Sequence, residues 1–287
     1  MRIAWSTPLD PRLEVAADPS AWCEFHEASK LPAAVARAQS QGFAPTPVQA
    51  HLMARAFRQV PTRTRVELPA GEPNPELMTT VMARRRSRRE LEEAVALADL
   101  AVVVQQALGP TMVTQDPQGG VRSVLRAWPS AGGLYPLDAY VVAQEVLGLA
   151  PGCYHVNTVS GCLERVEAPP VREVLERGFF WQEFTTTAAA VVLLVAVVER
   201  STAKYGERGY RFALLDAGHA AQNLLLTAEQ QHLSAVAVGG FDDDALAGCL
   251  GLDGTREAVV HTVALGGSPA PGPQPAPGEM PAPGEMP

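Results

Sequence analysis

The longest run of apolar residues lies between positions 188 and 198 and is rich in valine. This run, Ala188 to Val198, is too short to span a bilayer, so it predicts a buried central strand. Two shorter apolar runs, Ser234 to Val238 and Ala258 to Leu265, predict further strands. Asp138 to Val146 alternates poorly but is rich in β-forming residues, and we expect a strand there too.

Other segments carry hairpin or helix signals. Two β-rich segments, Gly152 to Val156 and Cys162 to Val166, predict a hairpin that turns at residues 158–161. Apolar residues at helical spacing, together with cap and stop signals, predict helices from Asn74 to Ala83, from the region of Leu91 to Leu108, and over Val171 to Arg177, Glu207 to His232 and Asp242 to Leu250. Gly109 to Gly120 is expected to be a loop, and Arg200 to Gly206 a polar connection.

The segment Arg84 to Glu90 contains five arginines among seven residues, in a chain of net charge -8. Ser87 and Glu90 have the spacing of a capping box, which predicts that the arginines begin the long helix ending at Leu108. The N-terminus of a helix favours anions, and guanidinium groups add charge-assisted hydrogen bonds. We therefore expect a phosphate site here, with a solvated basic patch or a nucleic-acid contact as the alternatives.

A second segment of interest is Pro129 to Pro136, which reads Pro-Ser-Ala-Gly-Gly-Leu-Tyr-Pro. Its two glycines, Gly132 and Gly133, allow the backbone to approach a ligand closely. The alternative is an ordinary tight loop. The sequence lacks the glycine-rich dinucleotide and P-loop motifs, the nucleophile elbow and paired-histidine metal spacing. A phosphate site without these motifs indicates a mononucleotide such as FMN, and no metal is expected.

With 47% hydrophobic and 19% charged residues, the chain can bury a full core. The order of the expected elements, helices first and then strands and helices mixed, suits an α+β sheet flanked by long helices. We expect a partly helical extension over residues 1–72, a main domain over residues 73–267 and a disordered Pro/Gly-rich tail over residues 268–287. Four cysteines without a CxxC pair predict free thiols, and no signal-peptide pattern opens the chain. A cytoplasmic protein is expected, with no membrane contact. Its acidic balance argues against general nucleic-acid binding.

Several of these segments resemble a known family. Arg85 to Arg89 resembles the RRSxR signature of nitroreductase-fold flavoproteins. Pro129 to Pro136 resembles the SagB/McbC branch, FMN-dependent dehydrogenases that oxidise azolines in peptide natural products. Asp216 to Asn223, Ala237 to Phe241 and Phe25 to Leu31 are similar to other blocks of that branch. The resemblance covers nearly the whole chain apart from the tail.

The resemblance implies a nitroreductase-like fold, with a central mixed sheet flanked by long helices, and a domain-crossing homodimer that holds FMN at its interface. Arg85, Arg86, Ser87 and Arg89 would hold the phosphate and ribityl chain. The other residues implied to bind the cofactor are Ser130, Ala131, Gly132, Gly133 and Leu134, from the partner subunit, with Gln222, Asn223, Gly239 and Gly240. One departure is the end of the last strand, where Gly266-Gly267-Ser268 stands in place of the basic residue that the family often has.

The adjacent pair Lys204 and Tyr205 matches the position of the catalytic Lys-Tyr pair of azoline oxidases. Which of the two would take the proton is open, and the alternative is a surface lysine beside a packing tyrosine. The resemblance implies oxidation of thiazoline or oxazoline rings in a peptide or carrier-bound substrate, with a cyclodehydratase complex as a partner. The other functions considered are an NAD(P)H-dependent nitro or quinone reductase and a non-catalytic scaffold subunit.

Overall fold

The computed structural model describes residues 25, 46–49, 60–62, 64–115, 122–179 and 182–267. Most of the expected N-terminal extension over residues 1–72 lies outside the described residues, as does the tail expected at 268–287. No helix in the described part of the chain combines the length and hydropathy needed to cross a bilayer.

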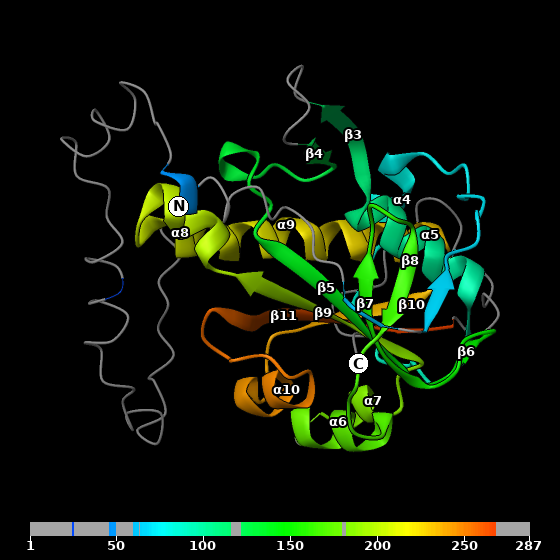
Figure 1. Ribbon diagram of the computed structural model, residues 1–287. Helices are drawn as coiled ribbons and strands as arrows, with labels where there is room; N and C mark the ends of the chain where they lie inside the picture. The colour runs from blue at the N-terminus through cyan, green and yellow to red at the C-terminus, as the bar shows by residue number, and fades with distance from the viewer. Residues whose placement is uncertain are drawn as a thin grey trace, which may run out of the picture.

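A seven-stranded sheet forms the centre of the molecule (Figure 1), in the order β1-β8-β7-β5-β9-β11-β10. Every pairing between these strands is antiparallel, which corrects the expected mixed sheet. A parallel pair, β2 with β6, stands outside it. The strands are β1 (Arg65–Glu67), β2 (Val95–Ala96), β5 (Leu137–Ala143), β6 (Val146–Leu147), β7 (Gly152–Asn157), β8 (Cys162–Arg165), β9 (Ala190–Val197), β10 (Ser234–Val238) and β11 (Glu257–Gly266).

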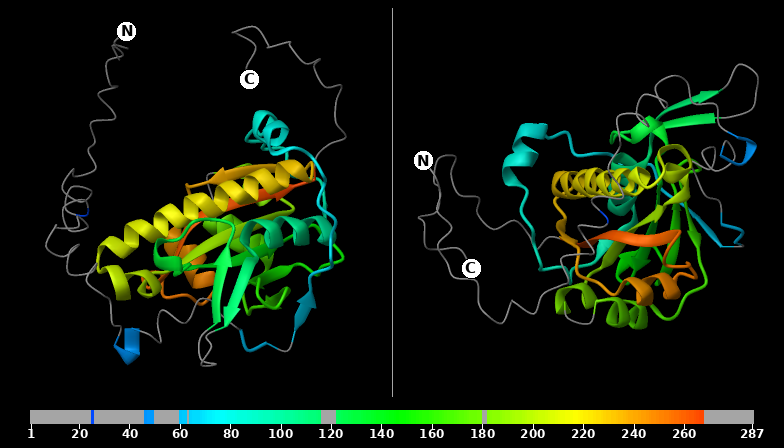
Figure 2. Two further views of the ribbon diagram at one scale, coloured as in Figure 1. Left: turned by 90° about the horizontal axis from the view of Figure 1, so that it is seen from above. Right: turned by 90° about the vertical axis from the view of Figure 1, so that its left-hand side faces the viewer.

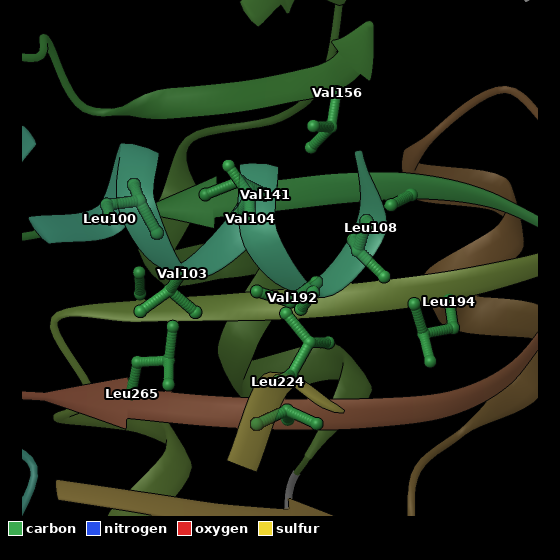
Figure 3. Close-up of a cluster of buried hydrophobic side chains, with 14 of the residues drawn as sticks. Leu100, Val103, Val104, Leu108, Val141, Val156, Val192, Leu194, Leu224 and Leu265 are labelled. Carbon is green, nitrogen blue, oxygen red and sulfur yellow. The ribbon is translucent and has the colours of Figure 1, made fainter. Parts of the chain in front are cut away.

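Helices cover both faces of the sheet. On one face lie α5 (Leu97–Leu108) and the long α9 (Arg208–Gln230), and on the other lie α6 (Val171–Gly178), α7 (Glu183–Thr186) and α10 (Asp243–Cys249). Each face buries its own apolar cluster. Figure 3 shows the cluster between the sheet and the first pair of helices, which includes Leu100, Val103, Val104, Leu108, Val141, Val156, Val192, Leu194, Leu224 and Leu265. The α+β arrangement expected from the sequence is therefore observed.

The predicted start of the long helix was wrong. The helix α5 begins at Leu97, and the preceding residues from Arg85 to Ala94 are extended or irregular. Tertiary backbone hydrogen bonds explain the difference, because the Leu91 carbonyl accepts from Ala189 N and the Glu93 carbonyl accepts from Gly267 N. Backbone groups that are paired across the sheet ends cannot also pair within a helix. Arg84 therefore ends the short helix α4 (Met78–Arg84), the other four arginines follow it, and none of them begins a helix.

The glycines at the end of β11 allow this crossing. A Cβ atom at Gly266 would lie 2.4 Å from the Leu91 carbonyl oxygen, and one at Gly267 would lie 2.7 Å from that of Ala94. Such contacts are too close for any side chain. The departure from the family pattern at Gly266 and Gly267 thus has a structural reason.

Two further expectations need correction. The polar connection after β9 is a helix, α8 (Glu199–Tyr205), whose residue Arg200 is buried. The loop expected over Gly109 to Gly120 contains a strand, β3 (Pro110–Gln115), which pairs with β4 (Arg122–Arg126). Polar composition suggested connections in both places, but long-range contacts decide the structure there.

The two ends of α9 carry different neighbours. Figure 2 shows α4 beyond the C-terminal end of α9 and away from the sheet. In the same figure α8 lies at the N-terminal end of α9. This separation determines which of the candidate residues can meet within one chain.

Candidate functional site

The five arginines divide into two groups by their partners. Arg84 donates from Nε to Glu229 at 2.5 Å, and its two amino groups donate to both carboxylate oxygens of Glu76, at 2.9 and 2.6 Å. Arg88 donates to Glu229 at 2.6 and 3.3 Å. Hydrogen bonds to Glu76 and Glu229 hold the pKa of Arg84 above its ordinary value. These two guanidinium groups are therefore neutralised within the protein.

The remaining arginines, Arg85, Arg86 and Arg89, form no ion pair with any carboxylate in the described part of the chain. Among the described residues, Arg86 donates to the carbonyl oxygens of Ala83 and Arg85, and it is exposed with Ser87 and Arg89. Three unneutralised cations and a hydroxyl on one short exposed segment have the donor chemistry that a phosphate dianion requires. They are the residues that the sequence predicts for phosphate contact.

The arginine segment borders the first residues of β10. The Arg88 N–H donates to the carbonyl oxygen of Ala235 on that strand. Arg89 lies over the Phe184 ring of α7, 5.5 Å from its centroid. Just before α7, Gln182 Nε2 donates to the Gly240 carbonyl oxygen at 2.8 Å. The predicted cofactor residues Gly239 and Gly240 thus lie in the same neighbourhood as the arginines.

The glycine-rich loop lies against the predicted catalytic pair. It forms a short 3-10 turn, η2 (Ala131–Gly133), in which Gly132 and Gly133 have φ angles of 66° and 65°. A Cβ atom at Gly132 would lie 2.6 Å from the Tyr205 hydroxyl oxygen and 2.9 Å from Lys204 Nζ. Both polar groups therefore converge on the Gly132 backbone. A side chain at that position would be strained and would clash.

The loop is fastened to α9 through a buried carboxyl group. Ser130 hydrogen-bonds to Asp216, and its hydroxyl accepts from the Tyr135 backbone N–H at 2.9 Å. Burial raises the pKa of Asp216, although Ser130, the neighbouring Trp128 and His219 act in the opposite direction. The Ser130 hydroxyl is thus committed to contacts that shape the loop. Ala131 and Leu134 belong to the same turn, with Leu134 buried.

Helix α8 is held in place by a buried ion pair. Arg200 donates two hydrogen bonds to Asp138 of β5, at 2.8 and 3.0 Å, and each side chain is 4% exposed. Lys204 stands one helical turn after Arg200, and the Tyr205 ring packs edge-on against Phe212 of α9 at 5.0 Å. The ion pair therefore fixes the helix that presents the Lys-Tyr pair.

Within one chain, the two groups of candidate residues do not meet. Glu229 holds the arginine segment at the last turn of α9, whereas Tyr205 packs beside Phe212 near its first turns. At 1.5 Å per residue, this stretch of helix separates them by about 25 Å. Gln222 and Asn223 lie between them on α9, Gln222 exposed and Asn223 half-buried. A single chain thus offers half of the site at each end.

Sequence reasoning missed the residues that support the site. Glu76, Glu229, Asp138 and Arg200 have no local motif that would single them out, and Asp216 stands out only as the first residue of a block similar to the family. The acid partner of Arg200, Asp138, lies 62 residues away in the sequence. The arginine partners of Glu229 lie at least 141 residues away. A buried acid in the last turn of a helix was the one available signal, because it opposes the helix dipole.

The chain matches one protein-family model and is similar in sequence to two named proteins. The model of the nitroreductase family matches residues 82–267. MJ1384 of Methanocaldococcus jannaschii, named as a nitroreductase, is 33% identical over 167 residues, which cover 58% of this chain and 80% of that protein. The microcin B17-processing protein McbC of Escherichia coli is 27% identical over 173 residues, which cover 58% of this chain and 63% of McbC.

Solved structures agree in fold. A nitroreductase-named protein of Anabaena variabilis superimposes with a TM-score of 0.64 at 24% identity over 86% of this chain and 47% of that one. This chain therefore spans less than half of that protein's length. The E. coli microcin synthetase McbBCD complex with bound truncated pro-MccB17 matches with a TM-score of 0.51 at 20% identity, over 88% of this chain and 98% of the matched one. At these identities the likeness concerns the fold alone.

Proposed function

This chain belongs to the nitroreductase family of oxidoreductases, and we propose that it acts as an FMN-dependent dehydrogenase that oxidises thiazoline or oxazoline rings to thiazole or oxazole. The observation that carries this proposal is the convergence of Lys204 Nζ and the Tyr205 hydroxyl on the Gly132 backbone. The sequence similarity to McbC, a microcin B17-processing protein, supports a peptide substrate.

The residues present suit FMN. Arg85, Arg86, Ser87 and Arg89 would hold the phosphate, because all but the half-buried Arg85 are exposed and the three guanidinium groups lack acid partners among the described residues. The backbone at Gly132 and Gly133 would lie along the flavin, since neither glycine carries a side chain that would keep a flat ring away. Gly239 and Gly240 would offer further backbone contacts. When bound, FMN would accept the hydride that leaves the azoline ring.

The protein's own contribution would be to position the ring and to take a proton. Oxidation of an azoline removes one proton and one hydride from the ring, so a base must lie beside the ring carbon. Lys204 and Tyr205 are suited to this role because they are adjacent and both face the loop. A positioned base typically contributes 10²–10⁴-fold in rate. The partner protein would be a cyclodehydratase, which forms the azoline.

A second function, reduction of nitro compounds or quinones with NAD(P)H, is favoured by the likeness to MJ1384, which has a nitroreductase name. Such a reductase receives its hydride from the nicotinamide and needs no base to deprotonate a ring carbon. A single experiment distinguishes the two functions. A reductase would bleach its flavin when NADH or NADPH is added without oxygen, whereas a dehydrogenase would bleach it when an azoline peptide is added.

FMN binding is the first prediction of this proposal. The purified protein should be yellow and should release FMN, not FAD, on denaturation. Arg86→Ala and Arg89→Ala should each weaken FMN binding by about 1–3 kcal/mol, the usual range for a lost charge-assisted hydrogen bond. Calorimetric titration measures both values, with Arg172→Ala in the exposed pair on α6 as the control. A wild-type protein that stays colourless in excess FMN would refute the cofactor.

The second prediction is a homodimer with a composite site. We propose that the arginine segment of one subunit faces the glycine-rich loop and the Lys-Tyr pair of its partner, since these halves lie about 25 Å apart in one chain. Exposed apolar side chains on α4 and α9, namely Leu77, Met78, Met82, Leu214 and Leu215, are available for such an interface.

Complementation tests this arrangement. A protein with both Arg86→Ala and Arg89→Ala is mixed with a Lys204→Ala protein, unfolded and refolded together. In a C2 dimer with a composite site, each heterodimer keeps one intact site, so about a quarter of all sites should recover activity. Light scattering should show a dimer. No recovery from a mixture of correctly refolded dimers would mean that each site is built from one chain.

A further inference from the structure

Glu229 stands in an unusual place for an acidic residue. It lies in the last turn of α9, where the helix dipole disfavours a negative charge, and its side chain is only 4% exposed. A buried carboxylate is costly unless it is paired and hydrogen-bonded. Its partners are Arg84 and Arg88, and the Glu229 backbone carbonyl accepts from Arg84 as well, at 2.9 Å.

These two arginines flank the residues expected to bind phosphate. The Glu229 carboxylate therefore holds Arg84 and Arg88, which stand on either side of the three-residue stretch from Arg85 to Ser87. Arg89 directly follows Arg88. At the same end, the Arg88 N–H is fixed on the Ala235 carbonyl oxygen. A charged segment of this kind would otherwise be spread apart by repulsion among its five like charges. The carboxylate both offsets that repulsion and closes the loop.

We infer that Glu229 is the positioning residue of the phosphate site: by holding Arg84 and Arg88 with one carboxylate, it orders the segment that leaves Arg85, Arg86 and Arg89 for the ligand. This inference rests on the proposed FMN function. Preorganisation of this kind raises affinity because ordering no longer has to occur on binding. Glu229 itself does not touch the phosphate, and neither do Arg84 and Arg88, whose donors are directed to Glu76 and Glu229.

The test compares Glu229→Gln with wild type in binding two flavins, FMN and riboflavin, which differ only in the phosphate. Glu229→Gln should weaken FMN binding about tenfold, because the segment is no longer ordered, and should leave riboflavin binding within about twofold. Amide hydrogen exchange in the cofactor-free protein should become faster over residues 85–90 and stay unchanged in α6. Glu176→Gln is the matched control, since it removes the same charge from an exposed arginine pair on the other face of the sheet.

Several outcomes would overturn the inference. An equal loss of FMN and riboflavin affinity would make Glu229 a general stabilising residue. Unchanged FMN binding, or tighter binding, would mean that Glu229 at most cancels charge. If the wild type binds riboflavin and FMN equally or binds neither, the proposed phosphate site fails, and that failure is visible without any variant. Hydrogen exchange would still report whether Glu229 orders the segment.

A second variant covers the case in which Glu229→Gln does not fold. Arg88→Gln removes the other half of the same clamp at a half-buried position. It should also weaken FMN binding selectively. In the double variant, the loss should be no larger than in Glu229→Gln alone, because Arg88 is proposed to act only through its pair with Glu229. Additive losses would instead assign Arg88 a direct contact with the phosphate and would contradict the inference.

Discussion

Lys204→Ala and Tyr205→Phe are each expected to slow the oxidation of an azoline peptide by about 10²–10⁴-fold, the usual contribution of a positioned base, while FMN stays bound. The reason is geometric, because both polar groups face the Gly132 backbone, where the flavin and the substrate ring are proposed to lie. Single-turnover measurements of flavin reduction by the peptide separate this loss from any change in binding. The Tyr205→Phe protein should keep the ring contact with Phe212 and therefore its fold.

Two controls separate the loss of a catalytic base from other effects of the substitutions. Dithionite should reduce the flavin of every variant at the wild-type rate, because that reaction needs no base. Tyr210→Phe is the matched tyrosine control, since its ring packs against Phe25 and away from Gly132. If both Lys204→Ala and Tyr205→Phe oxidise the peptide at nearly the wild-type rate, the pair is structural and the proposed mechanism loses its base.

Asp138→Ala is expected to destabilise the fold by about 3–5 kcal/mol, because it leaves the Arg200 guanidinium buried without its acid partner. The Arg200 Nε already lacks a hydrogen-bond partner among the residues that the structure describes. Arg126 lies close by, and burial lowers its pKa to about 10, an effect that Asp138 opposes and Arg200 increases. Removal of Asp138 therefore leaves the positive charges of Arg126 and Arg200 to repel each other without a neighbouring carboxylate between them. Chemical denaturation of the two proteins measures the loss.

The double variant Asp138→Leu with Arg200→Met should recover much of this stability, since removal of both charges leaves no uncompensated ion. It should still impair azoline oxidation, because α8, which carries the Lys-Tyr pair, then lacks the ion pair that anchors it to β5. Arg172→Ala, in the exposed ion pair with Glu176 on α6, is the control and should change stability by less than about 1 kcal/mol. If Asp138→Ala destabilised the fold no more than this control does, the buried ion pair would contribute little to stability.

Strands and helices whose signal is local were predictable. The valine-rich run became β9, the run from Ser234 became β10 within the same bounds, and the hairpin of β7 and β8 formed where expected. In each case continuous apolar or β-branched residues suit a buried strand better than any other structure. The long helix α9 was likewise evident from its apolar periodicity.

The arginine segment shows why the rest could not be predicted. A capping box and a helical stripe are local signals, and both were present at Ser87 and Leu91. Backbone hydrogen bonds with Ala189, Ala235 and Gly267, which lie about 100 or more residues away in sequence, decided the backbone conformation against these local signals. The same limit hid Glu229, because only the folded chain brings it to Arg84 and Arg88. A single sequence reports such pairings only through local patterns, and the one pattern here, an acid in the last turn of a helix, does not indicate its partners.

The position of the arginine segment beside β10 also bears on aggregation. β10 is the last strand of the sheet, and its sequence, Ser-Ala-Val-Ala-Val, is short and uncharged. An open strand of this kind can template pairing with the strand of another molecule. The Arg88 N–H occupies its Ala235 carbonyl, and the neighbouring charged side chains make the approach of a second edge unfavourable. The cationic segment that is proposed to hold phosphate therefore also opposes edge-to-edge association of the sheet with another molecule.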